Sequence, residues 1–154
     1  MDSAVTVVIL DNSITGMTGH QQNPSTGFDI NGKPAPQVDL EQIVRACGVN
    51  MVWVVDAYDL KSVESSLQGA IGAGEPAVVI ARRPCVLILR DAVREPYEIL
   101  PETCKRCKAC LKIGCPAIEI QDGTVRIDSV MCTGCGVCWQ ICKFTSIQKV
   151  GGEK

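Results

Sequence analysis

Cysteines are concentrated in the last third of the chain, where eight of the ten form two matching runs. Each run begins with three cysteines separated by two residues, and a fourth follows after four residues in the first run and three in the second. The runs are Cys104, Cys107, Cys110 and Cys115, and then Cys132, Cys135, Cys138 and Cys142. This spacing is typical of chains that hold a pair of [4Fe–4S] clusters. We therefore predict a protein that carries single electrons.

Thiolate sulfur also binds zinc and copper(I), so other metals have to be weighed. Zinc sites normally use two separated pairs of ligands that close one tetrahedron. Three cysteines separated by two residues fit one corner of a cubane cluster better than that tetrahedron. We keep a zinc-binding interaction module as an alternative, which iron and sulfide analysis would exclude.

Composition and charge narrow the class of protein. The chain has 154 residues, a formal net charge of −2 and 46% hydrophobic residues, enough for one domain or two small ones with a core. No basic stripe is available for phosphates, so we expect no nucleic-acid partner. No apolar run approaches the ~20 residues that span a bilayer, and no signal peptide is evident. We therefore expect a cytoplasmic protein without membrane contact, whose cysteines hold metal rather than disulfides.

The first part of the chain alternates segments that resemble strands and helices. The strand-like segments are residues 5–10, 51–55 and 76–81, and the helix-like ones are 38–47 and 60–71. Apolar residues share one face in each helix: Leu40, Ile43, Val44 and Cys47, and then Leu60, Val63, Leu67 and Ile71. We predict Asp39 as the first N-cap and Asp59 or Ser62 as the second. This order is typical of a parallel α/β sheet with buried strands. We assign it to residues 1–96.

Residues 97–154 contain an internal repeat. Cys104 and Cys132 begin its two copies, 28 positions apart. Between the copies, Asp122-Gly123 predicts the turn of a β-hairpin. Two half-domains related by a pseudo-two-fold axis fit an α+β bicluster ferredoxin domain.

A long polar segment, residues 12–36, follows the first predicted strand. Ligands bind at the carboxyl ends of strands in open α/β sheets, and long loops are usually functional. Asn12 offers an amide oxygen suited to Mg²⁺, although asparagine is also common in turns. His20, the only histidine, could hydrogen-bond an anionic ligand or contact its own backbone. Arg82 and Arg83 face either a partner or an anionic cofactor, or form a solvated pair at the sheet end.

Residues of this loop resemble a known family. Leu10-Asp11-Asn12 and the stretch from Thr15 to Gln21, Thr-Gly-Met-Thr-Gly-His-Gln, are similar to the second half of the thiamine-diphosphate motif of 2-oxoacid:ferredoxin oxidoreductases. Within that family they resemble the large (alpha) subunits of the indolepyruvate enzymes. Ala81-Arg-Arg-Pro-Cys85 and the downstream cysteine runs resemble them as well. The resemblance covers nearly the whole chain and implies a thiamine-diphosphate-binding domain followed by a 2[4Fe–4S] domain.

The resemblance also implies roles for individual residues. Asn12 and the carbonyl of Ile14 would bind the Mg²⁺ that holds the diphosphate. Met17, Thr18 and Gly19 would lie near the thiazolium ring. In bicluster ferredoxins the fourth cysteine of each run serves the other cluster. One cluster would then use Cys104, Cys107, Cys110 and Cys142, and the other Cys132, Cys135, Cys138 and Cys115.

The chain departs from the family pattern in several places. The first cysteine run contains an extra Gly114, and Lys143 follows Cys142 where proline is usual. The positive charge of Lys143 is expected to raise the potential of the Cys104 cluster. The Gly-Asp half of the thiamine motif is absent, as is the domain with the glutamate that activates the aminopyrimidine. The chain therefore resembles the C-terminal portion of a larger subunit, and alone it is not expected to be competent for catalysis.

The implied reaction is the oxidative decarboxylation of a 2-oxoacid, an aryl pyruvate such as indolepyruvate, to an acyl-CoA. The implied partners are coenzyme A, an external ferredoxin, and a beta subunit or another chain that supplies the missing thiamine-binding half. The alternative is a stand-alone ferredoxin-type electron carrier with a non-catalytic α/β domain.

Overall fold

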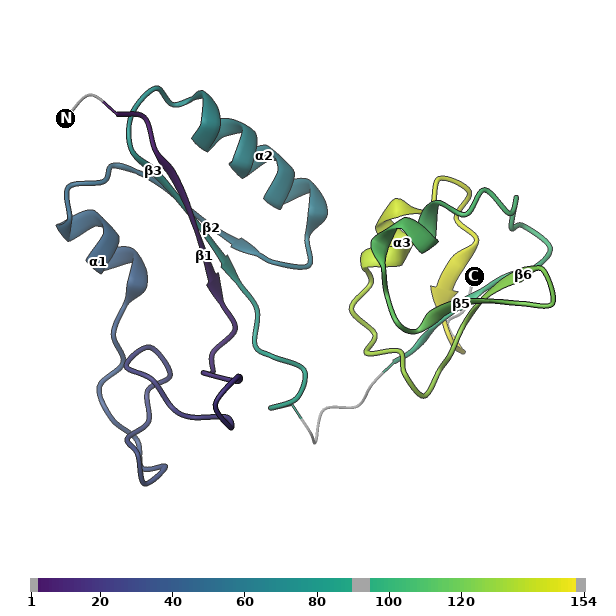
Figure 1. The fold of residues 1–154 in the computed structure, drawn as a ribbon, viewed down its shortest axis with the longest axis horizontal. Helices are drawn as coiled ribbons and strands as arrows, with labels where there is room; N and C mark the ends of the chain where they lie inside the picture. Colours follow the sequence, from purple (N-terminus) through teal and green to yellow (C-terminus); the bar gives the residue numbers. More distant parts are fainter. Residues whose placement is uncertain (1–2, 90–94, 152–154) are drawn as a thin grey trace. The chain divides into compact units, whose positions relative to one another are not determined.

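The computed structural model describes residues 3–89 and 95–151. The chain divides into two compact units, Met1–Arg90 and Asp91–Lys154. Figure 1 shows a sheet flanked by helices in the first unit and shorter strands and helices in the second. The boundary between residues 96 and 97 that we expected from composition stays a prediction.

A three-stranded parallel sheet forms the first unit, with the order β1-β3-β2. Its elements are β1 (Thr6–Asp11), α1 (Leu40–Ala46), β2 (Met51–Asp56), α2 (Leu60–Gly72) and β3 (Ala77–Arg82). Alternate side chains of a strand point to opposite faces of the sheet. Accordingly Val78 and Ile80 pack in the cluster with α1, whereas Ala77 and Val79 pack in the one with α2. The two helices lie on opposite sides of the sheet (Figure 1).

Both helices of this unit begin at the expected N-caps. The Asp39 carboxylate accepts hydrogen bonds from the amides of Glu41 and Gln42 at the start of α1. The Asp59 carboxylate accepts one from the amide of Ser62 at the start of α2. These bonds satisfy amides that have no partner within the helix.

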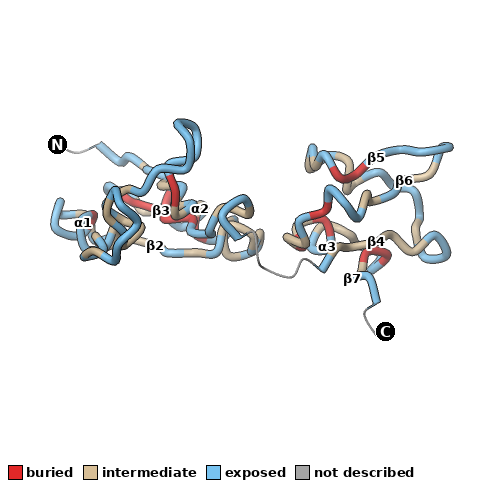
Figure 2. Tube along the Cα trace, turned by 90° about the horizontal axis from the view of Figure 1, so that it is seen from below, coloured by how far each residue is buried: buried red, intermediate tan, exposed pale blue. Residues whose placement is uncertain are grey.

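The expectation that the first strand is buried is wrong. Among the described residues β1 pairs with β3 alone, so it forms an edge of the sheet, and Leu10 is 78% exposed. Figure 2 shows that burial is concentrated along the central strand β3. The expected apolar helix faces are also wrong in part, because Ile43, Cys47 and Ile71 are exposed. A short helix over a three-stranded sheet contacts it through few positions.

In the described part of the second unit, residues 95–151, the chain forms two antiparallel strand pairs and two short helical turns. Its elements are β4 (Tyr97–Ile99), η1 (Ala109–Ile113), β5 (Ile118–Gln121), β6 (Thr124–Ile127), α3 (Val137–Ile141) and β7 (Ile147–Lys149). β4 pairs with β7, and β5 pairs with β6. Ile118, Val125, Cys138 and Ile147 form the core.

The predicted internal repeat is confirmed by the secondary structure. η1 and α3 occupy positions 109–113 and 137–141, 28 residues apart. A shift of 28 positions also brings β4 onto β6 and β5 onto β7, so each strand pair joins one strand from each half of the repeat. The predicted hairpin turn is confirmed too, since Asp122 and Gly123 have φ values of +50° and +74°.

Candidate functional site

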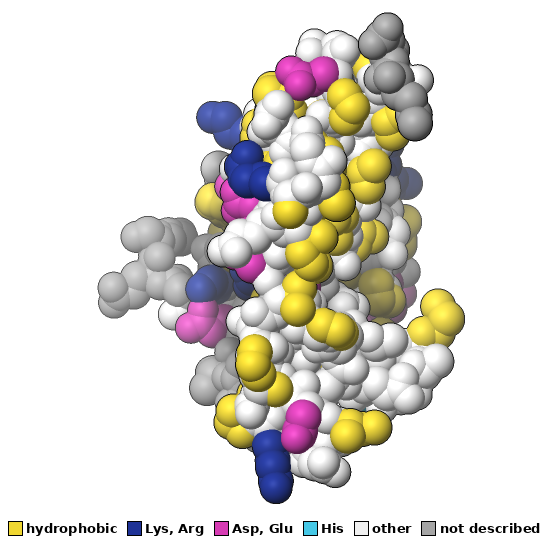
Figure 3. All heavy atoms as spheres, turned by 90° about the vertical axis from the view of Figure 1, so that its left-hand side faces the viewer, with side chains coloured by type: hydrophobic (Ala, Val, Ile, Leu, Met, Phe, Trp, Pro, Cys, Tyr) yellow, Lys and Arg dark blue, Asp and Glu magenta, His cyan; other side chains and the backbone are white. Residues whose placement is uncertain are grey.

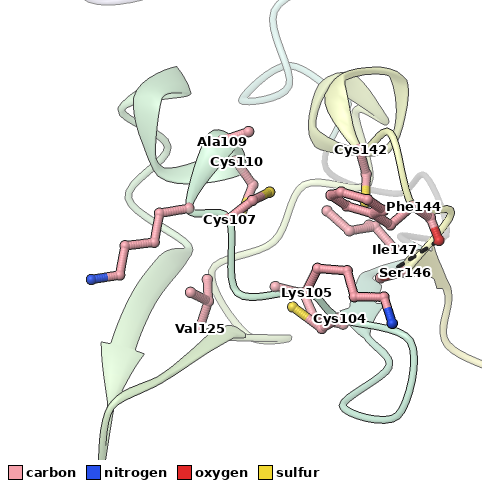
Figure 4. Close-up of a pocket in the computed structure, with 12 residues that line it drawn as sticks. Cys104, Lys105, Cys107, Ala109, Cys110, Val125, Cys142, Phe144, Ser146 and Ile147 are labelled. Carbon is pink, nitrogen blue, oxygen red and sulfur yellow. Dashed lines mark hydrogen bonds between the residues drawn. The ribbon is translucent and has the colours of Figure 1, made fainter.

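Four thiols from both cysteine runs meet at one pocket of the second unit (Figure 4). The enclosed cavity is small, about 20 Å³, and the pocket opens to solvent. Cys104 and Cys107 approach it from the loop that leads into η1, and Cys110 approaches it from η1 itself. Cys142 approaches it from the end of α3. The fourth cysteine of the second run therefore lies with the first three of the first run.

The other four thiols form a second group. Cys132 and Cys138 are buried, each with 8% of its surface exposed. Burial, then the neighbouring thiols of Cys135, Cys132 and Cys115, raises the pKa of Cys138 to about 11. Cys115, the fourth cysteine of the first run, is thus close enough to Cys138 to affect its ionisation.

Strand pairing explains why the fourth cysteines cross between the runs. Cys115 lies shortly before β5, which pairs with β6 of the second copy. Cys142 lies shortly before β7, which pairs with β4 of the first copy. Each pairing therefore carries a fourth cysteine to the opposite half of the unit.

The backbone of both runs bends in the same way. Arg106 and Lys108 in the first run have φ values of +52° and +60°, and Gly134 and Gly136 in the second have +71° and +75°. These positions are 28 residues apart in each case. Consecutive amides around left-handed residues form concavities that bind anions, including iron–sulfur clusters. In the second run the Tyr97 amide also donates a hydrogen bond to Cys132 Sγ at 3.4 Å.

These donors fit an iron–sulfur cluster. Within residues 3–89 and 95–151, no three His, Cys, Asp or Glu side chains converge as ligands of a single metal ion. The thiols of the first group instead surround a pocket. Amides that reach the ligand sulfurs would tune the potential of a bound cluster. The assignment of the eight cysteines as ligands stays a prediction.

The expected metal-binding turn follows β1 directly. Asn12 Oδ1 accepts a hydrogen bond from the Ile14 amide at 3.2 Å, and the Asn12 carbonyl accepts one from the Cys85 amide at 2.9 Å. Ile14 is buried and anchors the turn. Asn12 is exposed, so its amide oxygen keeps a lone pair available for a cation. This geometry fits a Mg²⁺ ligand.

Beyond this turn the loop forms a small exposed hairpin. The backbones of Thr15 and Gln21 exchange two hydrogen bonds of 3.0 Å. Met17, Thr18, Gly19 and His20 lie between them, and all four are exposed. Thr18 Oγ1 donates a hydrogen bond to Gln21 Oε1 at 2.6 Å. In the described part of the chain the His20 imidazole forms no hydrogen bond, so the expected alternative contact with its own backbone is not seen.

Two ion pairs at the carboxyl ends of the strands were not predicted from the sequence. Arg82 Nε lies 2.8 Å from Asp11 Oδ2, and an Arg83 guanidinium nitrogen lies 2.6 Å from Asp56 Oδ2. Arg83 also lies over the ring of Tyr58, 4.8 Å from its centre. The signal was present in the sequence, since both outer strands end in aspartate and the central one in arginine. The two ion pairs thus link the carboxyl end of the central strand to those of both outer strands.

The class of protein follows from comparison with known families. The description "Thiamine pyrophosphate enzyme, C-terminal TPP binding domain" matches residues 1–81, more than half of the chain. The chain therefore belongs to this enzyme family. The description "4Fe-4S dicluster domain" matches residues 97–143. The predicted fold, a partial thiamine-diphosphate-binding α/β domain followed by an α+β bicluster ferredoxin domain, is confirmed.

Curated relatives are more specific. The chain is 38% identical to the indolepyruvate oxidoreductase subunit IorA of Pyrococcus horikoshii, over 96% of this chain and 24% of that protein. It is 42% identical to IorA of Archaeoglobus fulgidus, over 92% of this chain and 24% of the relative. The chain is 41% identical to IorA of Methanothermobacter marburgensis, over 94% of this chain and 24% of the relative. The chain thus spans about a quarter of the length of these relatives and resembles their C-terminal portion, as predicted. No solved structure matches this chain.

The structure offers no candidate for a membrane span. Among the helices of the described residues, none combines the length and the apolar character that crossing a bilayer requires.

Proposed function

We propose that this chain is part of a thiamine-diphosphate-dependent 2-oxoacid:ferredoxin oxidoreductase. Its substrate is an aryl pyruvate, with indolepyruvate as the first candidate, and its product is an acyl-CoA. Two [4Fe–4S] clusters in residues 97–154 carry the electrons to an external ferredoxin. One observation supports the proposal above all others: a thiamine pyrophosphate domain and a dicluster domain share one chain that resembles IorA subunits.

The residues after β1 suit the handling of an anionic cofactor. Asn12 Oδ1 and the carbonyl of Ile14 would hold the Mg²⁺ of the diphosphate, while the exposed hairpin at Met17–Gly19 would contact the thiazolium ring. Thiamine diphosphate supplies the electron sink for decarboxylation. The chain itself positions the turn, because buried Ile14 and the Cys85 amide hold it at the sheet end. Arg82 neutralises Asp11 beside the same turn.

A partner chain or a further segment would complete the thiamine site. Large aliphatic side chains of the edge strand are exposed, among them Val7, Val8 and Leu10. Hydrophobic side chains also run down the middle of the face shown in Figure 3, with charged side chains along one edge and at both ends. Exposed apolar surface of this kind marks an interaction site. A beta subunit, coenzyme A and ferredoxin complete the proposed assembly.

The proposal is tested by Asn12→Ala in the complete assembly. We expect loss of 2-oxoacid-dependent decarboxylation, while dithionite still reduces the clusters, because the change removes a Mg²⁺ ligand in the other unit. Asn31→Ala is the matched control, since Asn31 lies exposed in the same loop and its side chain forms no hydrogen bond among the described residues. Unchanged turnover in Asn12→Ala would remove Asn12 from the site. An assembly that carries electrons but never binds thiamine diphosphate would favour the stand-alone electron carrier.

A further inference from the structure

Charge is distributed unequally between the two groups of cysteines. From Cys104 to Cys115 the chain carries four cations and no carboxylate, and Lys143 follows Cys142. Glu102 lies two residues before this run. From Val130 to Ile141, around the other three closely spaced cysteines, no residue is charged. We call Lys105, Arg106, Lys108, Lys112 and Lys143 the cationic rim.

The cationic rim is available to a partner. All five of its residues are exposed. Within residues 95–151, Lys149 forms an ion pair with Glu95. No carboxylate of the described residues lies within ion-pair distance of the cationic rim. Lys105 and Lys108 line the pocket of the first thiol group, together with half-exposed Phe144. Two of the five rim residues therefore lie at this pocket, and Figure 4 shows Lys105 beside Cys104 in its lining.

The two cysteine runs also differ in how they are covered. In the second run, a Cβ atom at Gly134 would lie 2.8 Å from the Glu95 carbonyl oxygen, and one at Gly136 would lie 3.1 Å from Tyr97 Oη. Residues 95–97 therefore pack directly on this run. The equivalent positions of the first run carry the exposed side chains of Arg106 and Lys108. The first run therefore opens to solvent where the second is closed by protein.

Backbone strain singles out the same two cations. Arg106 and Lys108 occupy the left-handed region, which strains the backbone of a residue that carries a side chain and leaves glycine almost unstrained. The second run uses glycine at both equivalent positions. Strain retained at an exposed surface is a pointer to function. In the first run the chain accepts this strain and gains two positive charges at the pocket.

We propose that the cationic rim is the docking surface for an acidic one-electron carrier protein, so that electrons leave through the cluster held by Cys104, Cys107, Cys110 and Cys142. The inference rests on the proposed function. In the transfer, the reduced cluster loses one electron and the oxidised carrier gains it, with no bond made or broken. Charge complementarity favours an acidic carrier, because opposite potentials steer proteins together and align them.

The rim would also direct electrons between the two clusters. A reduced cluster carries one more negative charge than an oxidised one, and nearby cations stabilise it. A cluster beside the rim would therefore have the higher potential, and one among the uncharged residues of the second run would have the lower. Electrons would then collect at the site that faces the carrier.

The test measures binding of an acidic 2[4Fe–4S] ferredoxin to the cluster-loaded full chain at several salt concentrations. We expect Lys105→Glu/Lys108→Glu to weaken binding at low salt about tenfold or more and to reduce its salt dependence. Arg106→Gly and Lys108→Gly remove charge and relieve backbone strain, so each should weaken binding while the fold is retained. Lys33→Glu/Lys61→Glu in the first unit changes the net charge as much as the double rim variant does and should bind normally. Iron content and reduction by dithionite are measured for every variant.

Several results would overturn the inference. One is unchanged ferredoxin binding in the rim variants although iron content is normal, which would leave the proposed function standing. Another is loss of binding only in Trp139→Ala, which changes an exposed residue of α3 beside Cys138 and would place the exit at the second cluster. Tighter binding of a DNA oligonucleotide than of ferredoxin would assign the rim to nucleic acid. A chain that holds no clusters would instead refute the proposed function.

Discussion

The backbone amide of Tyr97 donates a hydrogen bond to Sγ of Cys132, 35 positions farther along the chain. This bond joins the first strand of the second unit to the second cysteine run. The chain just before Tyr97 packs still closer, since the Glu95 carbonyl oxygen would lie 2.8 Å from a Cβ atom at Gly134. The covering of this run therefore depends on the absence of a side chain at position 134.

Gly134→Ala is expected to open this covering. The left-handed backbone at position 134 adds roughly 1–2 kcal/mol of strain for any side chain, and the methyl group would push residues 95–97 away from the run. Faster loss of the cluster should follow. The rate at which the visible absorbance bleaches under a chelator measures the effect.

Gly123→Ala separates strain from packing. Gly123 has a φ of +74°, close to the +71° of Gly134, but a Cβ atom there would have no neighbour within 4 Å. This variant should lose stability through strain alone and should bleach at nearly the wild-type rate. Equal bleaching of both variants would show that the packing of residues 95–97 does not protect the cluster.

Local patterns allowed much of the fold to be predicted. Asp39 and Asp59 precede apolar residues at helical spacing, and Asp122-Gly123 favours one tight hairpin turn. Each of these signals acts within a few residues and does not depend on the order of the strands. The structure confirms all three. The repeat of the cysteine runs could likewise be read from spacing alone.

Features that depend on strand order could not be predicted in this way. Nothing local shows that β3 lies between β1 and β2, so neither the exposure of Leu10 nor the pairing of Arg82 with Asp11 was foreseen. The same limit applies to the cysteine runs. Their spacing is nearly identical, yet residues 95–97 cover only the second, a difference set by packing of distant segments.

Cys142→Ser should damage the cluster of the first cysteine run more than that of the second. The reason is topological, because β7 carries Cys142 toward β4 and the pocket of Cys104. Cys115→Ser is the mirror variant and should damage the cluster of Cys132. EPR spectra of the two reduced variants, with iron content, check the prediction. The opposite pattern of lost signals would refute the crossed ligand assignment.

Arg82→Gln should weaken thiamine diphosphate binding in the complete assembly. The change removes the partner of Asp11, whose side chain is only 10% exposed and whose Oδ1 also accepts a hydrogen bond from the Ser13 amide beside Asn12. An ion pair of this kind stabilises by about 1 kcal/mol or less, so we expect a loss of affinity of up to about fivefold. Calorimetric titration with the cofactor and Mg²⁺ measures it.

Arg83→Gln provides the comparison for Arg82. Its partner Asp56 lies at the end of β2, and both side chains of this pair are more than 40% exposed. Because this pair is farther along the sheet from the Asn12 turn, its loss should leave cofactor affinity nearly unchanged. Equal losses in both variants would assign the effect to net charge rather than to the turn.

The chain without clusters should become less stable above about pH 9. Burial and the neighbouring thiols raise the pKa of Cys138 to about 11 from its ordinary value of 9.0, so the folded state holds this proton more tightly than the unfolded state. The resulting stabilisation is complete below about pH 9 and is lost as the pH rises through about 11. Urea unfolding of the metal-free chain at pH 8, 9 and 10 measures the decline.

Two comparisons identify the thiol responsible. Cys138→Ser should flatten the decline, whereas Cys47→Ser should not, because Cys47 is exposed in the other unit. The cluster-loaded chain should show no such decline, since sulfurs bound to iron no longer exchange protons. A metal-free chain of constant stability from pH 8 to pH 10 would mean that Cys138 is not held in a buried, thiol-rich site.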